Sequence, residues 1–151
     1  MSEEDIARFL EAQDELYCGY KQALAEIRAG RKSTHWIWYI FPQLRGLGYS
    51  RHAHLYGICG REEAARYLAH PLLGSRLREI TQALLQHRGK DAEAILGSVD
   101  ALKVCSSMTL FDALSPSDIF AEVLEEFYGG RRCAGTVKML SAGEQSGEGD
   151  E

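Results

Sequence analysis

The sequence lacks several features that define common classes of protein. It has no run of apolar residues long enough to cross a bilayer. Its first residues, MSEEDIARFLEAQ, are acidic and amphipathic, and they have neither the basic start nor the apolar block of a signal peptide. We therefore expect a cytoplasmic protein that does not act at a membrane.

The cysteines are also few and widely spaced. They are Cys18, Cys59, Cys105 and Cys133. None belongs to a C-x-x-C pair, and nothing in the sequence resembles a zinc knuckle or a redox pair. No local feature predicts a reactive thiol, so we expect reduced and mostly buried cysteines. We also expect no bound metal ion and no cofactor.

The commonest enzyme signatures are absent as well. The chain has no P-loop, no G-x-G-x-x-G that opens a βαβ unit, no H-E-x-x-H and no G-x-S-x-G. No segment shows the alternating pattern of a β-strand, and no internal repeat or linker divides the chain. Any functional site must therefore be argued from clusters of residues.

Helical spacing of apolar residues is the dominant pattern. With 151 residues, 45% of them hydrophobic, the chain can form one globular domain with its own core. We predict a compact all-α domain of about seven or eight mostly short helices over residues 1–140. Residues 141–151, SAGEQSGEGDE, are small, polar and acidic, which predicts a disordered tail.

Turn and cap residues place these helices along the chain. Residues 6–27 predict one long helix or two short ones broken near Gln13, and Gly30 suits a C-terminal cap. A short helix is expected at 61–69, and Pro71 fits the first turn of a helix that runs to Gly89. Further helices or single turns are expected after Ser50 and at 91–96, 100–114, 117–128 and 134–140.

The segment KSTHWIWYIFPQ, residues 32–43, has aromatic and aliphatic side chains on every face. We predict that residues 34–44 form a central buried helix that bends or ends at Pro42. Such a segment is either core or the wall of a binding site, and the sequence leaves both interpretations open.

Four residues of this segment could contact a ligand. Lys32 and His35 are three residues apart and could reach the same ligand oxygen. Trp38 offers a flat apolar face for a base or a sugar, and Gln43 offers both a donor and an acceptor.

Positive charge is concentrated in the middle of the chain. Residues 28–90 contain eleven Lys or Arg and three Asp or Glu, a balance of +8, whereas the remainder has a balance of −13. Such a bias is expected if this part of the chain faces an anion. Arg51, in the glycine-rich stretch GLGYSRHAHLYG, and Arg76, in the helix after Pro71, could supply the charge. Alternatively, the arginines pair with acidic residues elsewhere in the fold.

The stretch DALKVCSSMTLF combines charged residues with two adjacent hydroxyls. Asp100, Lys103 and Ser107 share a helical face, and Ser106 lies three residues after Lys103. A Lys–Ser pair can form a nucleophile, whereas a helix break capped by Ser106 or Ser107 accounts for the hydroxyls more simply. A third interpretation is an Asp100–Lys103 pair that keeps a polar pocket open.

The chain resembles the family catalogued as domain of unknown function 1810. The matching stretches are KSTHWIWYIFPQLRGLG, RYLAHPLLGSRL, DALKVCSSMTLF and FYGG, and the resemblance covers about residues 5–140. It implies a compact all-α fold but no settled catalytic residue. Three positions depart from the family pattern: Ile37 replaces a Met, Val104–Cys105 replaces Leu-Arg, and RRCAGT lacks an Asp. The label calpastatin, given to some members, does not fit a short apolar domain, because calpastatins are long and disordered.

Together these patterns predict one polar pocket that binds a small anionic, nucleotide-like metabolite. The expected ligand-binding residues are Lys32, Trp38, Gln43, Arg51, Arg76, Ser106 and Ser107, and the expected catalytic residues are His35 and Lys103. If the protein hydrolyses or transfers its ligand, His35 is the acid–base candidate, because an imidazole exchanges a proton near neutral pH.

The alternative is a non-enzymatic protein-interaction module, with an unknown protein partner, whose motifs are folding determinants. We do not expect a nucleic-acid partner, because the net charge is −5 and no run of Lys or Arg exceeds a pair.

Overall fold

The computed structural model describes the backbone of residues 3–149 and the side chains of residues 6–142. Over this range the chain forms ten α-helices and no β-sheet. The helices are α1 (Glu3–Gln13), α2 (Tyr20–Ala29), α3 (Ile37–Ile40), α4 (Arg51–Tyr56), α5 (Arg61–Ala69), α6 (Pro71–Leu85), α7 (Ala92–Leu96), α8 (Ser98–Leu114), α9 (Ile119–Tyr128) and α10 (Ala134–Gly149). The all-α prediction is confirmed, but the chain forms more helices over this range than the seven or eight predicted.

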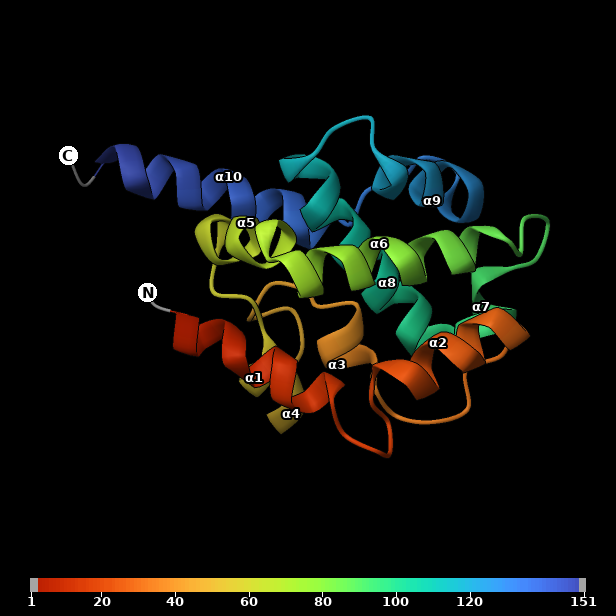
Figure 1. Cartoon of the computed structure of the whole chain (residues 1–151). Helices are drawn as coiled ribbons and strands as arrows, with labels where there is room; N and C mark the ends of the chain where they lie inside the picture. Colours follow the sequence, from red (N-terminus) through yellow and green to blue (C-terminus); the bar gives the residue numbers. More distant parts are fainter. Residues whose placement is uncertain (1–2, 150–151) are drawn as a thin grey trace.

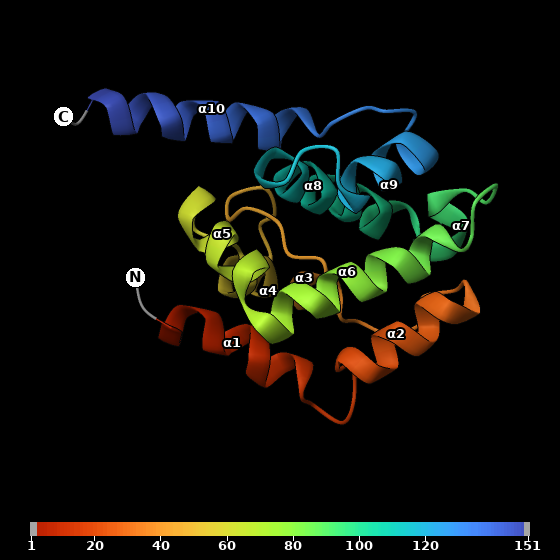
Figure 2. The ribbon, with the colours of Figure 1, turned by 45° about the horizontal axis from the view of Figure 1, so that its top comes forward.

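Helices α8 and α6 lie at the centre of the fold. Helix α8 contacts α3, α5, α7, α9 and α10, and α6 contacts α2, α5 and α9. Figure 2 shows α10 along one side of the molecule and α1 and α2 along the other, with α8 and α6 between them. This central position fits the sequence of α8, in which Val104, Met108, Leu110 and Phe111 are fully buried.

A buried glutamine joins the N-terminal helix to the rest of the fold. The Nε2 atom of Gln13, at the end of α1, donates hydrogen bonds to the carbonyl of Tyr39 (2.8 Å) and the hydroxyl of Tyr67 (3.0 Å). Its Oε1 atom accepts one from Arg76 (3.2 Å). One side chain thus connects α1 with α3, α5 and α6, which lie side by side in Figure 1.

Several predicted helix boundaries are confirmed. The first segment forms two helices, and Gly30 closes α2 in the left-handed conformation (φ 79°). Ser50 caps α4 by accepting a hydrogen bond from the N–H of Ala53. Helix α5 has the predicted bounds, and Pro71 opens α6, although α6 ends at Leu85 rather than near Gly89.

The predicted helix over residues 34–44 is wrong. Helix α3 covers only Ile37–Ile40, a single turn. The carboxylate of Glu26, on α2, accepts hydrogen bonds from the backbone N–H groups of Ser33 and Thr34 and from the indole N–H of Trp36. These bonds hold the preceding residues in an irregular loop, so the loop cannot join α3 in a longer helix.

The helix break at Ser106 or Ser107, one of the interpretations that the sequence left open, is absent. Helix α8 runs without interruption from Ser98 to Leu114, and both serines lie in its buried middle part. Neither serine caps a helix end. The contacts of α8 with five other helices keep it continuous and outweigh the low helix propensity of the two serines.

The last helix extends further than the sequence predicted. Helix α10 covers Ala134–Gly149 instead of residues 134–140. It therefore enters the segment 141–151, for which we predicted disorder; residues 150–151 lie outside the described part of the chain, and the disordered tail stays a prediction. Among the described residues, no helix is both long enough and apolar enough to span a membrane.

Candidate functional site

A hollow lies between the first half of α8, the segment 43–48 and the residue that precedes α10. Its volume is about 260 Å³. It is lined by Gln43, Leu47, Gly48, Val99, Leu102, Lys103, Ser106 and Cys133. We call it the α8 groove. It brings together Gln43, Lys103 and Ser106, three of the residues that the sequence predicted for a binding site.

A cluster of three charges lies beside the groove. The ammonium of Lys32 lies 2.8 Å from one oxygen of Asp100, and the ammonium of Lys103 lies 3.8 Å from the other. Two positive charges therefore share one carboxylate. The side chain of Lys32 is only 6% exposed, and it also donates to the carbonyl of Thr34, so this lysine is held within the structure. Lys103 is the member of the cluster that lines the groove.

Trp38 lies next to this cluster but is already covered. Its ring stacks on the imidazole of His52, with 4.5 Å between the ring centroids and 28° between the planes. The ammonium of Lys103 lies 5.3 Å from the centroid of the same ring, a cation–π contact. Trp38 thus positions Lys103. We expected a ligand to stack on the Trp38 ring, but the imidazole of His52 already stacks there.

The two serines of α8 have different environments. The hydroxyl of Ser106 lies 2.9 Å from the hydroxyl of Thr136, on α10, and Ser106 lines the groove. Ser107 is fully buried, does not line the groove, and its hydroxyl has no hydrogen-bond partner within the described part of the chain. Lys103 donates no hydrogen bond to either serine in the structure as described, so the geometry provides no activated Lys–Ser pair.

Three other predicted residues lie away from the groove. His35 and Arg51 are exposed, and neither lines the hollow. Arg76, on α6, donates to Gln13, lies 3.7 Å from Asp14 and stacks over the ring of Tyr20. The structure therefore does not bring His35, Arg51 and Arg76 to the site formed by Gln43, Lys103 and Ser106.

Cys133 is a groove residue that the sequence reasoning missed. It directly precedes α10, and its carbonyl accepts the N–H of Val137 (3.1 Å). Burial alone would raise the pKa of the Cys133 thiol. Hydrogen bonds from the hydroxyl and the N–H of Thr136, from the hydroxyl of Ser106 and from the N–H of Gly135 outweigh burial and lower this pKa. The stretch CAGT gives a local signal for this residue, because it places a thiol at a helix start with a hydroxyl three residues later.

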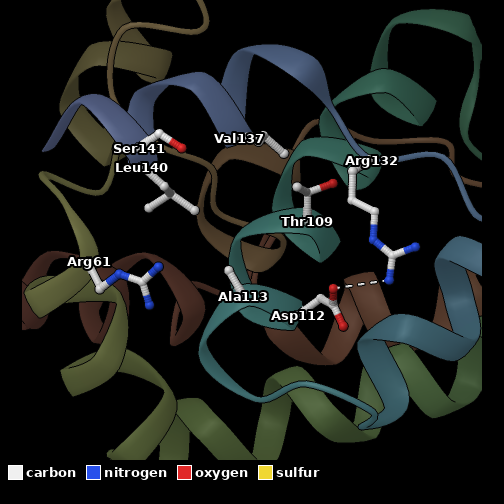
Figure 3. Close-up of a pocket in the computed structure, with 8 residues that line it drawn as sticks. All are labelled: Arg61, Thr109, Asp112, Ala113, Arg132, Val137, Leu140 and Ser141. Carbon is white, nitrogen blue, oxygen red and sulfur yellow. Dashed lines mark hydrogen bonds and ion pairs between the residues drawn. The ribbon is translucent and has the colours of Figure 1, made fainter. Parts of the chain in front are cut away.

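A second hollow, of about 220 Å³, lies on another side of α8. It is lined by Arg61, Thr109, Asp112, Ala113, Arg132, Val137, Leu140 and Ser141. Figure 3 shows Arg132 directed at Asp112, with 3.1 Å between the guanidinium and the carboxylate. Arg132 also donates to the carbonyl of Gly130 (2.7 Å). Because Asp112 already neutralises Arg132, we take the α8 groove as the candidate site.

Comparison with known proteins places the chain in a family. Residues 3–140 match the family described as "Protein of unknown function (DUF1810)". The chain belongs to the DUF1810 family. The resemblance found in the sequence is therefore confirmed.

A solved structure supports the same assignment. This DUF1810 protein is similar to the conserved hypothetical protein Rv1873 from Mycobacterium tuberculosis, with 46% sequence identity and a TM-score of 0.86. The match covers 91% of this chain and 96% of the mycobacterial chain. Comparison with curated proteins gave no match.

Proposed function

We propose that the α8 groove binds a small anionic metabolite, with the anionic group at Lys103. The observation that carries this proposal is the sharing of Asp100 between two lysines. Asp100 lies closer to Lys32 (2.8 Å) than to Lys103 (3.8 Å), so the charge of Lys103 is the less completely neutralised of the two. Lys103 is 22% exposed and lines the groove, so a ligand can reach it.

The remaining lining residues provide polar and apolar contacts. The side-chain amide of Gln43 makes no hydrogen bond within the described part of the chain, so it can both donate to and accept from a ligand. Leu47, Val99 and Leu102 form an apolar wall for the organic part of the molecule. A flat apolar body with a phosphate or carboxylate fits this wall, and nucleotide-like molecules are the first candidates.

The proposal is limited to binding. Hydrolysis or transfer would need an acid–base group within hydrogen-bond reach of the ligand. His35, the candidate from the sequence, is exposed and is not a lining residue, so we assign it no role in the groove.

A thermal-shift titration tests this proposal. The panel holds nucleoside phosphates, NAD, ADP-ribose and sugar phosphates, because each presents an anion on an organic body. A ligand at a hundred times its Kd adds about 2.7 kcal/mol to the stability and raises the midpoint visibly. We expect Lys103→Met and Gln43→Ala to remove this shift.

Lys21→Met is the matched control, because it removes the same charge from an exposed position on α2. The shift should persist in this variant. A ligand that stabilises Lys103→Met as strongly as wild type would show that it binds elsewhere, and a panel without any shift would reject these ligand classes.

A second candidate is a protein-interaction surface at the rim of the groove. The observation that favours it is the exposure of two apolar residues on α8, Val99 (63%) and Leu102 (71%). A photo-reactive amino acid at position 102, compared with one at position 21, tests it in cells. A discrete cross-linked protein seen only at position 102 supports the surface, and equal products at both positions reject it.

A further inference from the structure

We infer that Cys133 and Cys105 form an oxidation-sensitive thiol pair, in which a hydroperoxide oxidises Cys133 and Cys105 then closes a disulfide with it. This inference does not depend on what the α8 groove binds. It assigns a modification site to two cysteines that are 28 positions apart in the sequence and adjacent in the fold.

A threonine hydroxyl connects the backbones of the two cysteines. The hydroxyl of Thr109 donates to the carbonyl of Cys105 (2.7 Å) and accepts the N–H of Cys133 (2.9 Å). The sulfur of Cys105 lies 3.8 Å from the carbonyl oxygen of Arg131, two residues before Cys133. The Cys105 side chain is thus directed at the segment that immediately precedes Cys133.

The surroundings of Cys133 favour its anionic form. The hydroxyls of Ser106 and Thr136 and the backbone N–H groups of Gly135 and Thr136, at the start of α10, favour the thiolate and lower the pKa of Cys133. A thiolate is the nucleophile in reactions with peroxides, and helix starts and hydrogen-bond donors are what stabilise one in a protein. Both cysteines are partly exposed, so a small oxidant can reach them.

The two thiols differ in a way that orders the reaction. Burial and the negative charge of Cys133 raise the pKa of Cys105. The pKa of Cys105 is thus shifted in the opposite direction to that of Cys133, so Cys133 is the thiol that ionises first. Once Cys133 is oxidised to a neutral sulfenic acid, this charge is gone, and Cys105 ionises more readily and attacks.

The reaction balances with the hydroperoxide as the only oxidant. The Cys133 thiolate attacks the peroxide oxygen, the O–O bond breaks, and an alcohol, or water from hydrogen peroxide, leaves after taking a proton. The Cys105 sulfur then attacks the sulfenic sulfur, the S–S bond forms, and water leaves with the proton of Cys105. In total, two thiols and one hydroperoxide give one disulfide, one alcohol and one water.

Peroxide treatment followed by peptide mapping tests the pair. The reduced full-length protein is exposed to hydrogen peroxide, blocked with iodoacetamide and digested with trypsin, which cuts at Arg131 and Arg132 and so separates the two cysteines. We expect a linked peptide that contains Cys105 and Cys133, two hydrogen atoms lighter than its two parts, and lost on reduction. Cys59, which is exposed, is the internal comparison and should be modified later.

Two variants separate the steps. Cys105→Ser should accumulate a sulfenic acid on Cys133, trapped by dimedone, because nothing resolves it. Cys133→Ser should leave Cys105 reduced at the same peroxide dose. Circular dichroism confirms that both variants are folded.

Two results would overturn the inference. One is dimedone labelling of Cys59 or Cys105 ahead of Cys133. The other is a sulfenic acid on Cys133 that persists in wild type with no linked peptide, which would mean that Cys105 does not reach it.

Discussion

The carboxylate of Glu26 and the indole of Trp36 are joined by a buried hydrogen bond of 2.9 Å. The same carboxylate accepts the N–H groups of Ser33 and Thr34, at 2.7 and 3.0 Å, and the hydroxyl of Thr34, at 2.6 Å. Glu26 therefore organises the loop that leads into α3. That loop contains Lys32, whose pairing with Asp100 leaves Lys103 available to a ligand.

The first prediction concerns the charge of Glu26. Burial raises its pKa, but the hydrogen bonds from Thr34, Ser33 and Trp36 outweigh burial and lower the pKa to about 2. The folded pKa lies below the unfolded one, so the stabilisation is present above about pH 4.5 and is lost as the pH falls towards 2. We expect Glu26→Gln to cost about 2–3 kcal/mol of unfolding free energy at pH 7 and less than half of that at pH 3.

Urea unfolding at both pH values measures this effect. Glu93→Gln, at an exposed position on α7, is the control and should change little at either pH. A cost for Glu26→Gln that is the same at pH 7 and pH 3 would show that the charge is not its cause.

The second prediction concerns Gly74, in α6. Alanine usually stabilises a helix relative to glycine by about 1 kcal/mol. Here a Cβ atom would lie 2.1 Å from the carbonyl oxygen of Leu68, on α5, and a backbone atom cannot move aside cheaply. We therefore expect the opposite sign: Gly74→Ala should destabilise the protein by about 1–3 kcal/mol in chemical denaturation.

Gly60→Ala is the matched substitution, because a Cβ atom at Gly60 meets nothing within 4 Å. It should cost at most about 1 kcal/mol. Equal costs at both positions would mean that the contact between α5 and α6 gives way without strain.

The third prediction concerns the cap of α6. The Nδ1 atom of His70 accepts the N–H groups of Leu72 (3.1 Å) and Leu73 (3.2 Å). Removal of an N-cap costs about 1 kcal/mol, whereas another capping side chain retains most of the stability. We expect His70→Ala to lower the unfolding free energy by about 1 kcal/mol and His70→Asn to lower it much less. Equal losses in the two variants would indicate that packing of the imidazole, rather than capping, is the cause.

The fourth prediction contrasts adjacent serines. Ser107→Ala removes a buried hydroxyl that has no partner among the described residues, so we expect it to be neutral or to stabilise by about 0.5–1 kcal/mol. Ser106→Ala removes the hydrogen bond to Thr136 and should destabilise by about 1 kcal/mol. Thermal and urea unfolding of both variants measures the difference, and a marked destabilisation by Ser107→Ala would reveal a partner for its hydroxyl.

Local signals in the sequence were enough to place much of the fold. Gly30, Ser50 and Pro71 act within their own turns, so their caps and helix starts could be read directly. The bounds of α5 followed from the same kind of signal.

The errors in the fold have a common physical cause. The shape of the loop before α3 is set by Glu26, which lies seven to ten residues earlier and on another helix. The continuity of α8 is set by packing against five other helices. Contacts between elements decided both segments, and the pattern within each segment could not show them.

The candidate site could be predicted only in part, because contacts between distant elements also bring its residues together. Lys103 and Ser106 lie one turn apart on α8. Gln43, which directly precedes the backbone bridge between Leu44 and Ile58, lines the same groove. The sequence suggested these residues by chemical type. CAGT marks Cys133 only as a thiol near a helix start. That Cys133 lines the groove depends on α8, whose residues Lys103 and Ser106 are distant in the sequence.

The buried amide of Gln13 also defines where the folding unit begins. If α1 were removed, the carbonyl of Tyr39 and the hydroxyl of Tyr67 would lose their hydrogen-bond donor, and the surface that α1 covers would be exposed to water. In a chain that starts at α2, Arg76 would also lose its contacts with Gln13 and Asp14. The N-terminal helix is therefore an integral part of the domain. A shortened chain that starts at α2 would be less stable than the full chain.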